Sequence, residues 1–148
     1  MKILMVCLGN ICRSPLAEGI LRNKTQNLDI YVDSAGTASY HVGNLPDSRS
    51  IKIANKNGID LTDQRARQFS EKDFDDFDKI YAMDTNNYST IISLARDQLD
   101  RDKVDVILNE LNPESYDSIP DPYYGAGDGF QIVYEMLVNA CDAIVGKL

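Results

Sequence analysis

The segment from Lys2 to Pro15 constrains the fold of this chain more than any other part of the sequence. A run of apolar side chains leads up to Cys7, which is typical of a buried strand. Pro15 predicts that a helix follows, because the first turn of a helix tolerates a residue without an N–H. Between them, Gly9 and Asn10 are residue types that accept the positive φ of a tight loop. The sequence therefore predicts a buried strand, a tight loop and a helix in immediate succession.

This loop also collects groups that bind a phosphate-sized anion. Successive N–H groups of a tight loop bind anions, and the N-terminus of a helix adds to the attraction. Arg13 offers a planar guanidinium that matches two phosphate oxygens at once. A helix N-terminus and a nearby arginine favour the thiolate form of a cysteine, which is its nucleophilic form. We expect Ser14 to cap the helix and to point its hydroxyl at the sulfur of Cys7, which would attack phosphorus.

The string CLGNICRSP, from Cys7 to Pro15, resembles the signature of the low-molecular-weight protein tyrosine phosphatase family. The resemblance implies hydrolysis of protein phosphotyrosine and small aryl phosphates, with a phosphocysteine on Cys7 and with Arg13 binding the phosphate. It also implies that the rest of the loop binds the phosphate, namely Leu8, Gly9, Asn10, Ile11, Cys12 and Ser14. In family members the second cysteine can form a reversible disulfide with the nucleophile, which protects it from irreversible oxidation. The alternative is that Cys12 only packs under the loop.

The second half of the family pattern is the run Pro120-Asp121-Pro122-Tyr123-Tyr124. Taken alone, Pro-Asp-Pro is typical of an ordinary turn. Two prolines stiffen the backbone, however, and a carboxylic acid held near a phosphate can protonate the leaving oxygen. The resemblance implies that Asp121 is the general acid for thiolate attack and the general base for water. It further implies that Tyr123 and Tyr124 line the cleft.

Four further positions match the family less specifically. Ser34 is expected to hydrogen-bond Asn10 of the loop, and Asp84 to brace the catalytic arginine. Tyr40 falls where relatives place an aromatic residue at the mouth of the cleft. Gln64 falls where some relatives carry a histidine beside the loop asparagine, and we expect it to donate the same hydrogen bond.

Hydrophobic periodicity predicts strands that alternate with helices along the whole chain. Strands are expected over residues 2–7, 30–34, 79–83 and 104–108, and helices over 15–27, 48–57, 85–99 and from 130 onward, with a short one opening near 70. Such alternation predicts an α/β fold with a parallel sheet, helices on both faces and the site at the carboxyl ends of the strands. The resemblance implies four strands in the order 2-1-3-4, as in flavodoxin-like folds. The length of 148 residues predicts a single phosphatase domain over 1–148.

Composition limits the partners and the compartment. A net charge of -8 argues against nucleic acid as a partner, and no apolar run is long enough to span a membrane. The three cysteines show no disulfide or metal-ligand spacing, and neither does the single His41, so no metal or other cofactor is expected. A reducing cytoplasm suits this cysteine usage. The expected partners are a phosphotyrosine-containing protein as substrate and inorganic phosphate as product.

Two other functions share parts of this pattern. An arsenate reductase can use the same fold and loop, but it needs further cysteines to relay a disulfide, and none lies between Cys12 and Cys141. A phosphotyrosine-binding module without catalysis would lack the nucleophile, the arginine or the acid, and all three are present. The sequence therefore favours the phosphatase over both alternatives.

Overall fold

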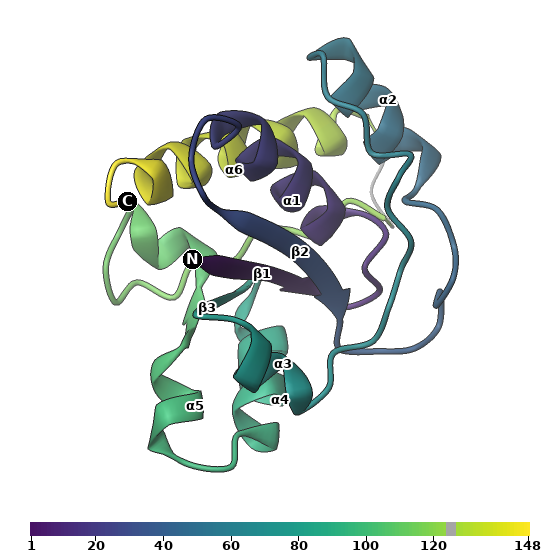
Figure 1. Ribbon diagram of the computed structural model, residues 1–148. Helices are drawn as coiled ribbons and strands as arrows, with labels where there is room; N and C mark the ends of the chain where they lie inside the picture. Colours follow the sequence, from purple (N-terminus) through teal and green to yellow (C-terminus); the bar gives the residue numbers. More distant parts are fainter. Residues whose placement is uncertain (124–126) are drawn as a thin grey trace.

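The computed structural model describes residues 1–123 and 127–148 and has an α/β architecture (Figure 1). The described strands are β1 (Lys2–Cys7), β2 (Tyr31–Gly36), β3 (Lys79–Ala82) and β4 (Val104–Val106). They form one sheet in the order β2-β1-β3-β4, and all three neighbouring pairs are parallel. The predicted fold class and strand order are therefore confirmed.

Helices cover both faces of the sheet, as Figure 1 shows. The helices on one face are α1 (Arg13–Lys24), α2 (Ser48–Lys56) and α6 (Gly129–Val145). Those on the other face are α3 (Lys72–Asp76), α4 (Thr85–Leu94) and α5 (Gln98–Asp102). Successive side chains of β1 alternate between the two apolar clusters, since Met5 lies in the first and Leu4 in the second. Burial on both faces explains why this strand is apolar throughout.

Several elements end before the residue that the sequence predicts, and in two of them a neighbouring aspartate accounts for the difference. The helix expected over 85–99 ends at Leu94, and Asp97 caps a new helix by accepting the N–H of Asp100. The strand expected over 104–108 ends at Val106, where Asp105 accepts the N–H of Val106 and the Nδ2 group of Asn109. The chain continues there as a 3₁₀ helix, η1 (Ile107–Glu110). In both places the aspartate side chain competes with the regular backbone hydrogen bonds.

The end of β2 lies directly against the loop that follows β1. The N–H groups of Thr37 and Ala38 each donate at 2.9 Å to the carbonyls of Cys7 and Leu8. A Cβ atom at Gly36 would lie 2.8 Å from the Leu8 oxygen, so this close approach requires glycine. The loop is therefore fixed at the carboxyl end of the sheet.

No helix in residues 1–123 and 127–148 is long and apolar enough to cross a membrane.

Candidate active site

In the loop between β1 and α1, Asn10 has the positive φ that the sequence predicts but Gly9 does not, and the helix begins earlier than expected. Asn10 has a φ of 56°, in the left-handed region. The helix starts at Arg13, two residues before Pro15, and Cys12 occupies the N-cap position without a side-chain capping bond. The prediction that Ser14 caps the helix is therefore wrong, because this residue already lies in the first helical turn and its hydroxyl bonds within the loop.

Ser14 instead contacts the sulfur of Cys7. Its Oγ atom lies 3.0 Å from the Sγ of Cys7 and accepts a hydrogen bond of 2.8 Å from the Nδ2 group of Asn10. The orientation of the Asn10 amide is fixed because its Oδ1 accepts the backbone N–H of Arg67 at 3.0 Å. While its oxygen accepts from Asn10, the Ser14 hydroxyl can donate its hydrogen to the Cys7 sulfur at 3.0 Å or to the carbonyl of Ala35 at 3.5 Å. The residue predicted as the nucleophile is therefore within hydrogen-bonding distance of a hydroxyl group of the loop.

A buried carboxylate lies behind this network. The expected bond between Asn10 and Ser34 is present, with Nδ2 donating to Oγ at 2.9 Å. Ser34 in turn donates to the Oε1 of Glu18 at 2.7 Å. Glu18 is only 2% exposed, and burial raises its pKa to about 7 against the lowering effects of Ser34 and Arg22. A chain of side-chain contacts therefore runs from a buried titratable group to the nucleophile.

The Arg13 guanidinium is held between two acidic side chains. It is 3% exposed, and its Nη1 group donates to Asp84 Oδ2 at 2.7 Å and to the carbonyl of Ile119 at 3.0 Å. Its Nη2 group lies 3.6 Å from Asp121 Oδ2. Burial opposes the charged form, but negative charge on the Cys7 sulfur and on the two carboxylates outweighs it and raises the pKa of Arg13. Arg13 is therefore a fixed cation at the end of the loop.

Asp84 and Asp121 are themselves positioned by the backbone. Asp84 caps α4, since its Oδ1 accepts the N–H of Asn87 at 2.7 Å, which leaves Oδ2 for the arginine. Asp121 accepts the N–H of Tyr123 on Oδ1 at 3.0 Å and turns Oδ2 toward Arg13. The Asp121 side chain is 33% exposed, so a substrate can reach it.

A pocket opens over the loop and contains most of the residues predicted to bind substrate, but the buried Asn10 and Ser14 do not line it. Its lining comprises Cys7, Leu8, Gly9, Ile11, Cys12, Arg13, Tyr40, His41, Asp121 and Tyr123. Tyr40 is 77% exposed and Tyr123 37% exposed, as expected for aromatic side chains at the mouth of a cleft. His41, which the sequence reasoning did not assign to the site, lies close to the loop, since a Cβ at Gly9 would be 3.0 Å from its Cδ2. Tyr124 lies outside the described residues.

The expected hydrogen bond from Gln64 to Asn10 is not formed. The Nε2 group of Gln64 donates to the carbonyl of Pro15 at 3.1 Å, while the oxygen of Asn10 accepts from the backbone of Arg67. Sequence reasoning also missed Glu18, although its position four residues after Ser14 places both on one face of α1. That spacing is the signal that could have identified it.

The remaining sulfur chemistry is simple. All three cysteines are free thiols, and Cys7 and Cys12 both line the pocket. Burial is the main reason that the pKa of Cys12 is raised far above its ordinary value, so this thiol stays protonated. Among the described residues, no group of three or more His, Cys, Asp or Glu side chains could hold a metal ion.

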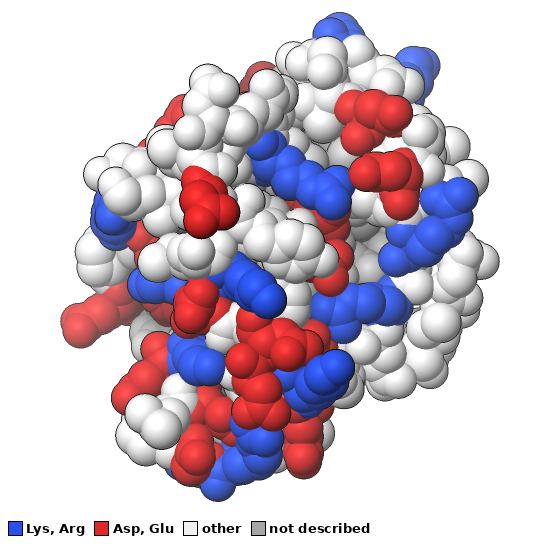
Figure 2. Space-filling model, in the orientation of Figure 1, with Lys and Arg blue, Asp and Glu red and all other residues white. Residues whose placement is uncertain are grey.

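Charged side chains of both signs cover the face of the molecule seen in Figure 2. Figure 2 shows acidic and basic side chains interleaved across this face, with acidic groups dense over the half that contains α3 and α5. Ion pairs such as those of Arg67 with Asp33 and Asp73 connect many of them. Among the described residues that line the pocket, Arg13 is the one Lys or Arg.

Comparison with known proteins agrees with this geometry. The family model described as low molecular weight phosphotyrosine protein phosphatase matches residues 2–148. A low molecular weight phosphotyrosine protein phosphatase of Schizosaccharomyces pombe is 42% identical over 143 residues, 93% of this chain and 90% of that protein. A crystal structure of a protein tyrosine phosphatase from Entamoeba histolytica, with Hepes in its active site, superposes with a TM-score of 0.91 at 38% identity and covers 100% of this chain and 99% of that one. A Drosophila arginine phosphatase superposes with a TM-score of 0.88 at 35% identity, over 99% of this chain and 97% of its own.

Proposed function

Because the chain belongs to the low molecular weight phosphotyrosine protein phosphatase family, we propose that it hydrolyses phosphotyrosine through a phosphocysteine on Cys7. The observation that carries this mechanism is the meeting of three groups at one pocket. A thiol, a buried guanidinium and a partly exposed carboxyl line it together, on Cys7, Arg13 and Asp121. A phosphate bound over the loop would contact all three, and each then has one chemical task.

Binding uses the loop and the arginine. The backbone N–H groups from Leu8 to Arg13, with the N-terminus of α1, would surround the non-bridging oxygens of the phosphate. The guanidinium of Arg13 would pair with two of these oxygens and neutralise charge as the phosphoryl group transfers. Asp84 keeps that guanidinium in place at 2.7 Å, so little reorganisation is needed when the substrate arrives.

The first displacement transfers the phosphoryl group to sulfur. The Cys7 thiolate, facing the Ser14 hydroxyl at 3.0 Å, attacks phosphorus in line with the tyrosine oxygen. The S–P bond forms while the P–O bond to the tyrosine breaks. Asp121 donates its proton to the departing phenolate oxygen, which leaves as the neutral phenol of tyrosine.

The second displacement releases phosphate. A water molecule attacks the phosphorus of the phosphocysteine, and the carboxylate of Asp121 takes its proton. The S–P bond breaks, which returns the Cys7 thiolate and the protonated Asp121 and leaves inorganic phosphate as product. The same carboxyl thus acts first as acid and then as base, so both half-reactions need it within reach of the phosphorus-bound oxygen.

The walls of the pocket favour an aromatic substrate. Tyr40, His41 and Tyr123 place flat rings at its mouth, where a phenyl ring can stack. Among the described lining residues, Asp121 is the one carboxylate, which offers little to a cationic guanidino group. We therefore propose phosphotyrosine-containing proteins as substrates and treat phosphoarginine, suggested by the Drosophila relative, as the competing class.

The same proposal extends to the organisation and location of the chain. We propose that residues 1–148 act as one phosphatase domain, since the pocket draws on residues from both ends of the sequence. A thiolate nucleophile and three free cysteines suit a reducing compartment, for which the cytoplasm is our proposal.

The leaving-group dependence of kcat/KM tests the mechanism. Cys7→Ser should abolish release of phenol from aryl phosphates, with or without chelator, while inorganic phosphate still binds. Asp121→Ala should lower kcat/KM by roughly a hundredfold or more for phenyl phosphate and far less for para-nitrophenyl phosphate, whose phenolate leaves without a proton. Asp117→Ala, an exposed aspartate on the same connection, is the matched control and should resemble wild type.

Three results would overturn the proposal. Turnover that survives in Cys7→Ser would remove the phosphocysteine. An equal loss for good and poor leaving groups in Asp121→Ala would remove the acid assignment. Faster hydrolysis of a phosphoarginine peptide than of the matched phosphotyrosine peptide would change the substrate class.

A further inference from the structure

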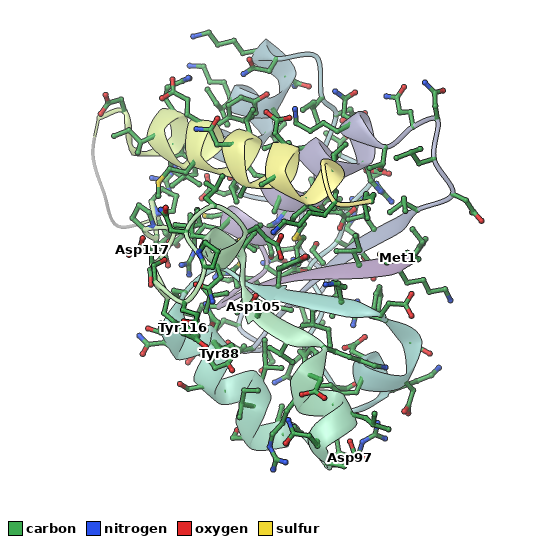
Figure 3. The ribbon with its side chains drawn as sticks, turned by 90° about the vertical axis from the view of Figure 1, so that its left-hand side faces the viewer. Met1, Tyr88, Asp97, Asp105, Tyr116 and Asp117 are labelled. Carbon is green, nitrogen blue, oxygen red and sulfur yellow. The ribbon has the colours of Figure 1, made fainter. Side chains whose placement is uncertain are left out.

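The long connection from η1 to α6 carries Asp121. Before this residue, contacts with the sheet, with Arg13 and with α4 hold the connection in place. The N–H of Ile119 donates at 2.8 Å to the carbonyl that follows β3, and the carbonyl of Ile119 accepts from Arg13 at 3.0 Å. Further back, the ring of Tyr116 meets that of Tyr88 on α4 edge to face at 5.9 Å, and Figure 3 shows the two side by side. The upstream half of the connection is thus tied to the sheet and to α4.

On the downstream side, Arg49 of α2 reaches the same connection. Its Nη2 group donates to the carbonyl of Tyr123 at 3.3 Å. Its guanidinium carbon lies 5.5 Å from the centre of the Tyr123 ring and 4.7 Å from that of Phe130, within the range of cation–π attraction. Phe130 belongs to the first turn of α6. One guanidinium therefore joins α2 to the acid loop and to the start of the last helix.

Arg49 is itself fixed relative to the phosphate loop. Its Nε and Nη2 groups each bond one oxygen of Asp47 at 3.0 Å, a two-point contact that orients the guanidinium plane. These bonds hold the pKa of Asp47 below its ordinary value. The backbone N–H of Asp47 donates to the carbonyl of Ile11 in the phosphate loop at 2.7 Å. The guanidinium is therefore positioned from the loop that binds phosphate.

The peptide groups of Tyr123 complete a path to the acid. Its carbonyl accepts from Arg49, and its N–H donates to Oδ1 of Asp121 at 3.0 Å. We propose that Arg49 is a positioning residue that sets the distance between the Asp121 carboxyl and the phosphate loop. This inference rests on the proposed role of Asp121 as general acid and base, and it adds a residue that touches neither the substrate nor the reacting atoms.

A positioning role has a selective signature. A displacement of about 1 Å at a catalytic group can cost up to roughly a hundredfold in rate. The loss falls on steps that need proton transfer by Asp121, whereas phosphate binding by the loop depends on hydrogen bonds that Arg49 does not make. Removing Arg49 should therefore reproduce, in weaker form, the leaving-group dependence that removal of the acid produces.

The test compares Arg49→Met in two backgrounds. In the wild-type background, kcat/KM should fall roughly tenfold for phenyl phosphate and less than about twofold for para-nitrophenyl phosphate, with vanadate affinity unchanged. In the Asp121→Ala background, the same substitution should change kcat/KM by less than about twofold, because it has no acid left to misplace. Arg65→Met, at an exposed arginine whose Nη1 group donates to the carbonyls of Thr62 and Gln64, is the control and should match wild type in both backgrounds.

The outcomes distinguish a failure of the role proposed for Arg49 from a failure of the acid role proposed for Asp121. If Arg49→Met lowers kcat/KM by the same factor in both backgrounds, or by the same factor for both leaving groups, the role of Arg49 is overturned while that of Asp121 stands. If Asp121→Ala alone shows no leaving-group dependence, the acid assignment fails and the role of Arg49 falls with it. Should Arg49→Met not fold, Phe130→Leu removes the ring beneath the guanidinium and must show the same selectivity, in smaller measure, or the proposal is wrong.

Discussion

Replacing Glu18 with glutamine should change how the stability of the fold depends on pH. The carboxyl of Glu18 is 2% exposed beneath the phosphate loop. Burial is the main cause that raises its pKa from an ordinary 4.5 to about 7, and the negative charges of Asp33 and Asp63 add to it. The hydroxyl of Ser34 at 2.7 Å and the guanidinium of Arg22 at 3.2 Å act in the opposite direction without cancelling it.

The sign follows from proton binding. Because the folded state holds this proton more tightly than the unfolded chain, Glu18 contributes its stability fully below pH 4.5 and loses it as pH rises through about 7. At about 1.4 kcal/mol for each pH unit between those values, the total is roughly 3 kcal/mol. A glutamine has the same shape, accepts the Ser34 hydroxyl and cannot ionise. The free energy of unfolding of Glu18→Gln minus that of wild type should therefore rise by about 3 kcal/mol between low and high pH.

Urea unfolding followed by far-ultraviolet circular dichroism, from about pH 4 to about pH 8, measures this difference. Taking the difference between the two proteins cancels the titration of groups that both share. Glu135→Gln, at an exposed position of α6, is the control and should track wild type at every pH. If the difference in unfolding free energy between Glu18→Gln and wild type stays constant or falls as pH rises, the pKa of Glu18 is not raised in the folded protein.

Three further substitutions test how the pocket is built. Asp84→Asn removes the charge 2.7 Å from Arg13, so kcat/KM for aryl phosphates should fall roughly tenfold or more and vanadate should bind more weakly. Unchanged kcat/KM and vanadate affinity would show that Asp84 does not hold Arg13 in place. Gly36→Ala puts a methyl group 2.8 Å from a loop carbonyl and should lower the free energy of unfolding by roughly 1–3 kcal/mol together with kcat/KM; a stable, fully active variant would exclude the close approach. Cys12→Ser should be inactivated irreversibly by mild peroxide, whereas thiol should restore the wild type through a disulfide between Cys12 and Cys7; equal recovery would rule out that protection.

The part of the fold that local pattern controls could be predicted from the sequence. The parallel α/β class could be predicted from the apolar run of β1, the residues that permit a tight turn and the alternation of elements. Family resemblance supplied the strand order. The division of the helix expected over 85–99 was missed, because Asp97 looks like an exposed helical residue until its side chain is seen to cap α5. Competition between a side chain and the backbone is decided by geometry that composition does not record.

The candidate site, like the fold, could be predicted from the sequence only in part. The family resemblance identified the described residues that line the pocket except His41, whereas the contacts of the side chains behind them depend on tertiary structure. A glutamate within a helix is ordinarily assigned to the solvent face, and only the packing of β2 on α1 places Ser34 over Glu18. Likewise, nothing local to Arg49 indicates Tyr123, which is 74 residues further along the chain. Asp84 and Ser34 also hold residues of the loop, and they were predicted only through the family resemblance, whereas Glu18 and Arg49 were missed.

The most direct test of the account is to trap the covalent intermediate. Wild-type protein mixed with a phosphotyrosine peptide should be denatured within a single turnover and examined by phosphorus NMR and peptide mass spectrometry. We expect a phosphoryl group on the peptide that contains Cys7, bound through sulfur, and none in Cys7→Ser. Phosphate release without any phosphoenzyme, or a phosphoryl group on another residue, would contradict it.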